Sequence, residues 1–213
     1  MKALILVDLQ NDFMPGGPLS VKEADKVLPV IQNLLSYPFD LVIATKDWHP
    51  KDHCSFARTH HLAPGDLLSI KDKQQILWPA HCIQNTAGAD FVSGLDTTKI
   101  NQIVYKGTEK DLDSYSTFFD NDRKKSTGLE LLLQEKQIKQ VYIAGLATDY
   151  CVKYSTIDAV RLGFNTFVII DACRGVNLHP NDTKIAIEEM IREGAHIITS
   201  EKLLKAKKGL LNV

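Results

Sequence analysis

The fold of this 213-residue chain is decided by Val141-Tyr-Ile-Ala-Gly-Leu-Ala-Thr-Asp-Tyr-Cys151. The first four residues form a short apolar run that stops at Gly145, which is typical of a buried parallel strand. Thr148 and Asp149 are favourable residues for a helix start, and apolar residues then recur at helical spacing up to Gly163. We therefore expect a strand, a turn and a helix, with Cys151 in the first turn of that helix.

A cysteine at the start of a helix is a candidate nucleophile. The positive end of the helix dipole and the unpaired backbone N–H groups favour the thiolate over the thiol. The same N–H groups can hold an oxyanion formed when a thiolate attacks a carbonyl. The alternative is an ordinary core residue, because free cysteine is often buried. For Cys151, the polar residues elsewhere in the chain favour the nucleophile.

The pattern of a strand followed by a helix recurs on both sides of this stretch. Further continuous apolar runs predict buried strands over residues 2–7, 41–44, 103–105, 164–170 and 196–199. Helical spacing predicts helices from about residue 27, from about residue 127 and over residues 182–193. Strands alternating with helices predict a three-layer α/β/α fold, doubly wound around a mainly parallel six-stranded sheet. Residues 50–101 show no strong periodicity, and we interpret this long loop as functional.

The composition indicates one domain in the cytoplasm. With 25 basic and 26 acidic residues, the formal net charge of −1 gives no field that would attract nucleic acid or an anionic membrane. No apolar run approaches the roughly 18 residues that span a bilayer, and the first run is too short for a signal peptide. Four cysteines without a CxxC pair indicate free thiols in a reducing compartment. We expect a single domain over residues 1–200 and a lysine-rich tail, residues 201–213, that can fray.

Polar residues follow four of the predicted strands where each strand ends. Asp8, Asp47, Lys106 and the loop before Cys151 each leave a different strand. Ligands of open α/β sheets bind beyond the carboxyl ends of the strands, so these residues should share one rim. Taken singly, Asp8 could cap a turn and Lys106 could be solvated. Jointly, an acid or base, a cation and a nucleophile predict an acyl-transfer site.

A candidate metal site lies next to these groups. Asp47 and His49 are two residues apart at a strand end, so their side chains lie on the same side of the chain. A carboxylate and an imidazole suit zinc or iron, and His81 or His53 from the long loop can supply a third ligand. Such a pair alone can be a chance match. Cys82 competes as ligand or nucleophile, but no helix start lies beside it to lower its pKa.

Five motifs carry these residues: Val7-Asp-Leu-Gln-Asn-Asp-Phe13, Thr45-Lys-Asp-Trp-His49, Trp78-Pro-Ala-His-Cys82, Tyr105-Lys-Gly107 and Gly145-Leu-Ala-Thr-Asp-Tyr-Cys151. Together they resemble the nicotinamidase/pyrazinamidase family of the isochorismatase-like cysteine hydrolases, over about residues 2–199. Asp-Trp-His with Trp-Pro-x-His-Cys is particular to nicotinamidases. The resemblance implies hydrolysis of nicotinamide to nicotinate and ammonia, and of pyrazinamide to pyrazinoate, through a thioester in NAD salvage.

The resemblance also implies a role for each matching residue. The family's catalytic triad falls on Asp8, Lys106 and Cys151. Its metal ligands fall on Asp47, His49 and His81. They imply one divalent ion, with zinc preferred and iron or manganese as alternatives. His53 matches a position that is a ligand in only some members, so it is either a fourth ligand or a neighbour of the site.

The remaining matches concern the substrate pocket. Phe13 and Trp78 match aromatic residues that flank the pyridine ring, and Leu19 matches another pocket wall; ordinary core residues are the alternative. In the family the peptide bond before the residue matching Ala147 is cis. That geometry would aim the Ala147 N–H, with that of Cys151, into an oxyanion hole.

Other functions stay open at this point. Another amidase on this scaffold would act on a carbamoyl or ureido compound and would not need a metal that binds pyridine. An isochorismatase need not use a cysteine nucleophile. A flavodoxin-like nucleotide-binding module lacks support, because no GxGxxG follows the first strand and no GxxxxGK[ST] occurs. The sequence predicts a small-molecule substrate. It does not determine the oligomeric state, and a homo-oligomer is one of the alternatives.

Overall fold

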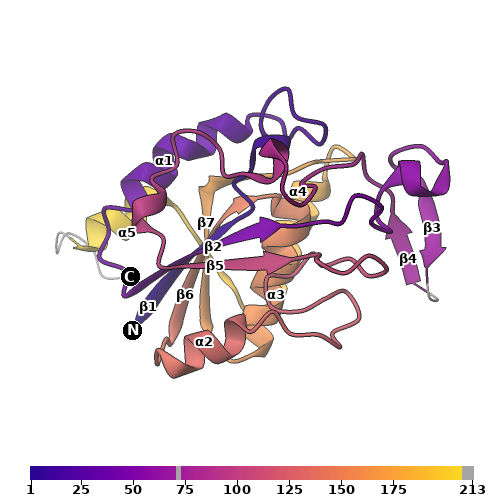
Figure 1. Cartoon of the computed structure of the whole chain (residues 1–213). Helices are drawn as coiled ribbons and strands as arrows, with labels where there is room; N and C mark the ends of the chain where they lie inside the picture. The colour runs from indigo at the N-terminus through magenta and orange to yellow at the C-terminus, as the bar shows by residue number, and fades with distance from the viewer. Residues whose placement is uncertain (71–72, 208–213) are drawn as a thin grey trace.

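The computed structural model describes residues 1–70 and 73–207. At its centre is a six-stranded sheet in the order β5-β2-β1-β6-β7-β8, with every neighbouring pair parallel (Figure 1). The strands are β1 (Lys2–Val7), β2 (Leu41–Asp47), β5 (Gln102–Lys106), β6 (Gln140–Leu146), β7 (Asn165–Arg174) and β8 (His196–Ile198). Strand order reverses between β1 and β6, which confirms the predicted doubly wound sheet and places a ligand-binding crevice between these strands.

Helices cover both faces of the sheet and complete the three layers (Figure 1). They are α1 (Val27–Leu34), α2 (Leu129–Glu135), α3 (Lys153–Arg161), α4 (Asp182–Glu193) and α5 (Ser200–Lys207). Alternate residues of β1 serve opposite faces, as expected for a strand buried on both sides. Leu4 belongs to the same core cluster as Ile31 of α1, whereas Ile5 belongs to the cluster that contains Leu133 of α2 and Met190 of α4.

The long segment between β2 and β5 contains regular structure that the sequence did not reveal. An antiparallel hairpin of β3 (Leu67–Ile70) and β4 (Lys73–Ile76) stands at the side of the molecule (Figure 1). Its strands are four residues long and largely exposed or half-buried, so they carry no continuous apolar run. Single 3-10 turns occur along the chain at Asn11–Phe13, Ala24–Lys26, Ala57–His60, Ala87–Ala89 and Thr97–Lys99.

The turn after β6 differs in detail from the expected helix start. A π-helical turn, Thr148–Val152, precedes α3, and neither Thr148 nor Asp149 caps it with a side chain. The carboxylate of Asp149 instead accepts the N–H groups of Val176 at 2.9 Å and Asn177 at 2.7 Å, which ties this turn to the loop after β7. The prediction of these two residues as helix caps was therefore wrong. The peptide bond between Leu146 and Ala147 is cis, as the resemblance implied.

The lysine-rich tail begins as helix α5 rather than as a frayed segment. Leu203 of α5 is buried in the same hydrophobic cluster as Ile31 of α1, so α5 packs against the core. Residues 208–213 of the predicted tail lie outside the described residues, and the domain boundary at residue 200 stays a prediction. Within residues 1–70 and 73–207, no helix is long and apolar enough to cross a membrane. No disulfide joins the four cysteines, all of which lie among the described residues, as expected.

Candidate active site

The switch point of the sheet brings Asp8 and Cys151 together. Val7, the last residue of β1, pairs with Gly145 of β6, and the chain turns at Asp8 with φ of 52°. A Cβ on Gly145 would lie 2.1 Å from the Val7 carbonyl oxygen, so only glycine allows the two strands to approach this closely. The strand-end positions inferred from the sequence therefore converge in space.

Lys106 is the hub of a buried group of charges. Its Nζ lies 2.8 Å from Asp8 Oδ2 and 3.2 Å from Cys151 Sγ, and it also pairs with Asp47 Oδ1. Parallel pairing sets Asp47 directly opposite Lys106 at the ends of β2 and β5. Thr45 donates its hydroxyl to Asp8 Oδ1 at 2.6 Å, which fixes the orientation of that carboxylate. The structure thus unites Asp8, Lys106 and Cys151, which the sequence had placed on one rim.

Burial controls protonation in this group. It raises the pKa of the Cys151 thiol well above its ordinary value, and the Asp8 and Asp47 carboxylates raise it further against the opposing effect of Lys106. The expectation that the helix start makes Cys151 a thiolate was therefore wrong. Burial also raises the pKa of Asp8, although Lys106 opposes this shift. A thiol beside a carboxylate of raised pKa is suited to proton transfer at the moment of attack.

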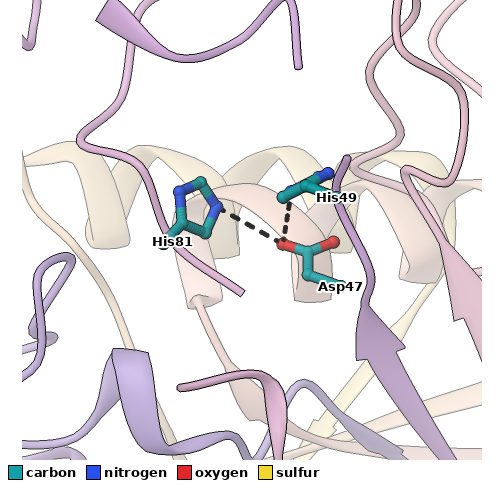
Figure 2. Close-up of side chains that lie close together, drawn as sticks. All are labelled: Asp47, His49 and His81. Carbon is teal, nitrogen blue, oxygen red and sulfur yellow. Dashed lines mark ion pairs between the residues drawn. The ribbon is translucent and has the colours of Figure 1, made fainter. Parts of the chain in front are cut away.

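A second cluster, made of a carboxylate and two imidazoles, adjoins the first (Figure 2). Asp47 Oδ2 lies 3.5 Å from His49 Nε2 and 3.7 Å from His81 Nε2. All three side chains are buried. Burial would raise the pKa of Asp47, but Lys106 and then His49 outweigh it and hold this pKa well below its usual value. Asp47 is therefore a permanent anion that uses one oxygen for Lys106 and the other for the histidines.

Backbone pairing brings the two histidines together from separate segments. The N–H of His49 donates to the carbonyl of Cys82 at 3.0 Å, and the N–H of Gln84 donates to the carbonyl of His49 at 2.8 Å. His49 Nδ1 lies 2.8 Å from the Gly107 carbonyl, and His81 Nδ1 lies 2.7 Å from the Pro79 carbonyl. Because carbonyls only accept, each Nδ1 carries a proton, and Nε2 is the nitrogen of each ring that faces Asp47.

His53 lies beside this cluster. Its ring stacks on His49 with centroids 4.1 Å apart. Its Nδ1 lies 2.8 Å from Ser55 Oγ, and its Nε2 lies 3.3 Å from the Leu112 carbonyl. Burial, with His49 beside it, lowers the pKa of His53 to about 4, so the ring is neutral at pH 7. His53 thus lies beside the cluster, and one of its ligand atoms is within 4.8 Å of ligand atoms of His49 and Asp113, so both alternatives for His53, fourth ligand or neighbour, stay predictions.

Gly107 must lack a side chain for His49 to keep its place. A Cβ there would lie 2.3 Å from His49 Cε1, and the residue has a φ of +61°. We expect Gly107→Ala to destabilise the fold by about 1–3 kcal/mol from the backbone strain, with a further loss from displacement of the ring. Urea unfolding measures the sum. Gly65→Ala is the matched control, because Gly65 has a φ of +94° and open space around it. Equal losses in the two variants would contradict the packing argument.

One pocket unites the residues assigned to substrate. Its lining includes the cluster of Asp47, His49 and His81 as well as Cys151. It also includes the residues predicted to contact substrate, which are Phe13, Leu19, Trp78 and Ala147. Asp8 and Lys106 are not part of the lining, but Lys106 Nζ lies 3.2 Å from Cys151 Sγ. Four further lining residues were not predicted from the sequence: Asp113, Tyr115, Tyr150 and Val176.

Tyr115 is a pocket residue that the sequence did not predict. Its hydroxyl accepts from Trp78 Nε1 at 3.1 Å and from Gln75 Nε2 at 3.1 Å, so it ties the pocket wall to the hairpin. Tyr115 lies nine residues beyond Lys106, the last residue of β5. Position at a strand end, which marked the other site residues, therefore did not single it out.

Comparison with known proteins agrees with this geometry. The isochorismatase domain model matches residues 2–202. The nicotinamidase of Acinetobacter baylyi is 43% identical over 203 residues, which cover 95% of this chain and 94% of that protein. A nicotinamidase and pyrazinamidase from Acinetobacter baumanii has a solved structure with a TM-score of 0.91, 41% identity and coverage of 95% of this chain and 97% of its own. A pyrazinamidase of Pyrococcus horikoshii, solved in complex with zinc, has a TM-score of 0.76 and 38% identity, covering 93% and 98% of the two chains. This chain therefore belongs to the isochorismatase family and, within it, to the nicotinamidases.

Proposed function

We propose that this protein hydrolyses nicotinamide to nicotinate and ammonia, with one bound divalent metal ion and a thioester to Cys151 as intermediate. The observation that carries the proposal is the junction of two clusters at Asp47. One carboxylate oxygen pairs with Lys106 of the nucleophile group, and the other faces His49 and His81. This junction supports the proposal, because a metal ion held by the histidines would bind the ring nitrogen next to the thiol that would attack the carboxamide.

The donor set at Asp47, His49 and His81 fits a metal ion. Ligand atoms about 2 Å from a tetrahedral zinc lie about 3.3 Å from one another, close to the two spacings between Asp47 and the imidazoles. The ligand atoms of all three residues lie within 4.8 Å of one another, and both imidazoles are oriented by carbonyls. Zinc suits this set best, with iron or manganese as alternatives. When bound, the ion supplies a Lewis acid that anchors the ring nitrogen of the substrate and so orients the carboxamide.

The chain's own residues carry the proposed chemistry. Asp8 takes the thiol proton as Sγ of Cys151 attacks the carboxamide carbon, and the oxyanion is held by the N–H groups of Ala147 and Cys151. Asp8 then returns the proton to the departing ammonia. In the second half, Asp8 accepts a proton from water as that water attacks the thioester, which releases nicotinate and restores the thiol. Lys106 stabilises the negative charge on Asp8 before each proton transfer and the negative charge that develops on Sγ as its proton leaves.

The pocket walls define the substrate class. Phe13 and Trp78 would flank a flat heteroaromatic ring, and Leu19 would close the remaining side. Pyrazinamide shares the ring nitrogen and the carboxamide with nicotinamide, so we expect the pocket to accept both. Salvage of NAD in the cytoplasm is the setting that these assignments imply.

Ammonia release from nicotinamide tests the proposal directly. We expect rapid release by the metal-loaded protein, and loss of release both after chelation and after thiol alkylation. Restoring zinc to the chelated sample should restore activity, whereas restoring it to the alkylated sample should not. No release from metal-loaded protein would contradict the proposal and favour an amidase that acts on a carbamoyl or ureido compound.

A further inference from the structure

A buried carboxamide outside both clusters is bonded to the main chain of Asp47. The Gln10 side chain donates from Nε2 to the Asp47 carbonyl at 2.8 Å and accepts the Asp47 N–H at Oε1, also at 2.8 Å. A third bond runs from Nε2 to the Ala89 carbonyl at 3.0 Å. Gln10 is fully buried, so its amide is held in one orientation by three protein partners.

The sheet explains why these bonds matter. Strand β1 pairs with β2 only as far as Leu6 opposite Ala44, and the chain turns away at Asp8. The other neighbour of β2 continues, since Asp47 still lies opposite Lys106 of β5. The N–H and carbonyl of Asp47 therefore have no partner in β1, because the pairing of β1 with β2 has already ended. The Gln10 side-chain amide supplies both hydrogen bonds that a main-chain peptide group of β1 would otherwise make. Buried main-chain groups without such partners are costly.

We infer that Gln10 is a positioning residue that sets the place of Asp47 for both the metal ion and Lys106. This inference rests on the proposed function, because it assumes that Asp47 is a metal ligand. The Asp47 carboxylate divides its two oxygens between Lys106 and the histidines, so a small backbone shift would disturb both sets of contacts at once. Gln10 itself touches neither the reacting thiol nor the imidazoles in any bond recorded among the described residues.

Cobalt(II) binding provides a test that does not depend on turnover. Metal-free protein is titrated with cobalt(II), and the visible d–d absorption reports both affinity and ligand geometry. We expect Gln10→Ala to bind cobalt(II) about 10- to 100-fold more weakly than the native chain and with an altered band, as for other groups that orient a metal ligand. Activity lost in this variant should return in part when metal is added in excess, as expected for weakened metal affinity.

Asn101→Ala is the matched control. Asn101 Oδ1 accepts the N–H of Val42 at 2.7 Å, so this amide side chain also bonds the main chain of β2, but near the opposite end of the strand from Asp47. We expect native cobalt(II) affinity, native absorption and native activity from this variant. A comparable loss of affinity in both variants would mean that any weakening of β2 suffices, and would overturn the specific role of Gln10.

The outcomes separate this inference from the proposed function. If the native chain binds no cobalt(II), the metal site itself is refuted. If the native chain binds it and Gln10→Ala binds equally well, only the role of Gln10 is refuted. Should Gln10→Ala fail to fold, Gln10→Glu keeps an acceptor for the Asp47 N–H while losing the amide donors. Its affinity should then fall below the native value, and native affinity would overturn the inference.

Discussion

Cys151→Ala is expected to reduce turnover of nicotinamide by about 10⁴-fold or more, because the proposed covalent route has no other nucleophile at the carboxamide carbon. The fold should survive, since burial keeps this residue a neutral thiol and its loss removes no charge from the core. Metal content should stay near native, because the sulfur is absent from the Asp47, His49 and His81 cluster. Ammonia release and elemental analysis of the same sample measure both quantities.

A second buried cysteine serves as the control for this substitution. Cys173 is also buried and contacts the Ile169 carbonyl at 3.3 Å, away from the lining of the substrate pocket. Cys173→Ala should therefore keep near-native turnover. Appreciable hydrolysis by Cys151→Ala, beyond the background of the uncatalysed reaction, would refute the thioester route.

Lys106→Met is expected to cost both activity and stability. The ammonium is fully buried between the Asp8 and Asp47 carboxylates, and methionine replaces it with an apolar chain of similar length. Two buried carboxylates would then face each other without a cation, and breaking a buried ion pair in this way costs about 3–5 kcal/mol. Urea unfolding at neutral pH should show this loss. Ammonia release should fall with it, because Asp8 and the negative charge that develops on Sγ during the attack lose their counter-charge.

Two further variants separate the effect of the buried Lys106 charge on stability from other effects of the substitution. Lys110→Met removes an exposed lysine that pairs with Asp52, and should leave stability nearly unchanged. The double variant Asp8→Asn with Lys106→Met removes one of the stranded carboxylates, so it should regain part of the lost stability while staying inactive. A Lys106→Met protein as stable as the native chain would contradict the view that this lysine neutralises the core of the site.

The sequence predicted the sheet because its strands are buried on both faces. Such strands appear as unbroken apolar runs, as at residues 3–7, where the run ends at the polar residue Asp8. The same feature located the site, since the carboxyl ends of parallel strands share one edge. The β3–β4 hairpin escaped this reasoning, because its short strands are half-exposed and carry lysine and glutamine in place of an apolar run.

The protonation of Cys151 could not be predicted in the same way. The helix start argued for a thiolate, but burial has the largest effect and raises the pKa of the thiol, and Asp8 and Asp47 raise it further against the opposing effect of Lys106. A pKa depends on the full set of charges within a few ångströms and on the depth of burial. Neither quantity is a property of a local motif.

By itself, then, the sequence determined the order of strands and helices, the rim on which Asp8, Lys106 and Cys151 meet, and the family resemblance of the motifs around them. The tertiary structure alone decided how those residues share their charges and what holds them in place. Asp47 joins the two clusters because β2 and β5 end in register, and Gln10 reaches it only because β1 turns away first. The physical reason is one of range. Hydrophobic periodicity depends on residues that are close in the sequence. Hydrogen bonds and the electrostatic effects that shift pKa values act between residues that only the folded chain brings together.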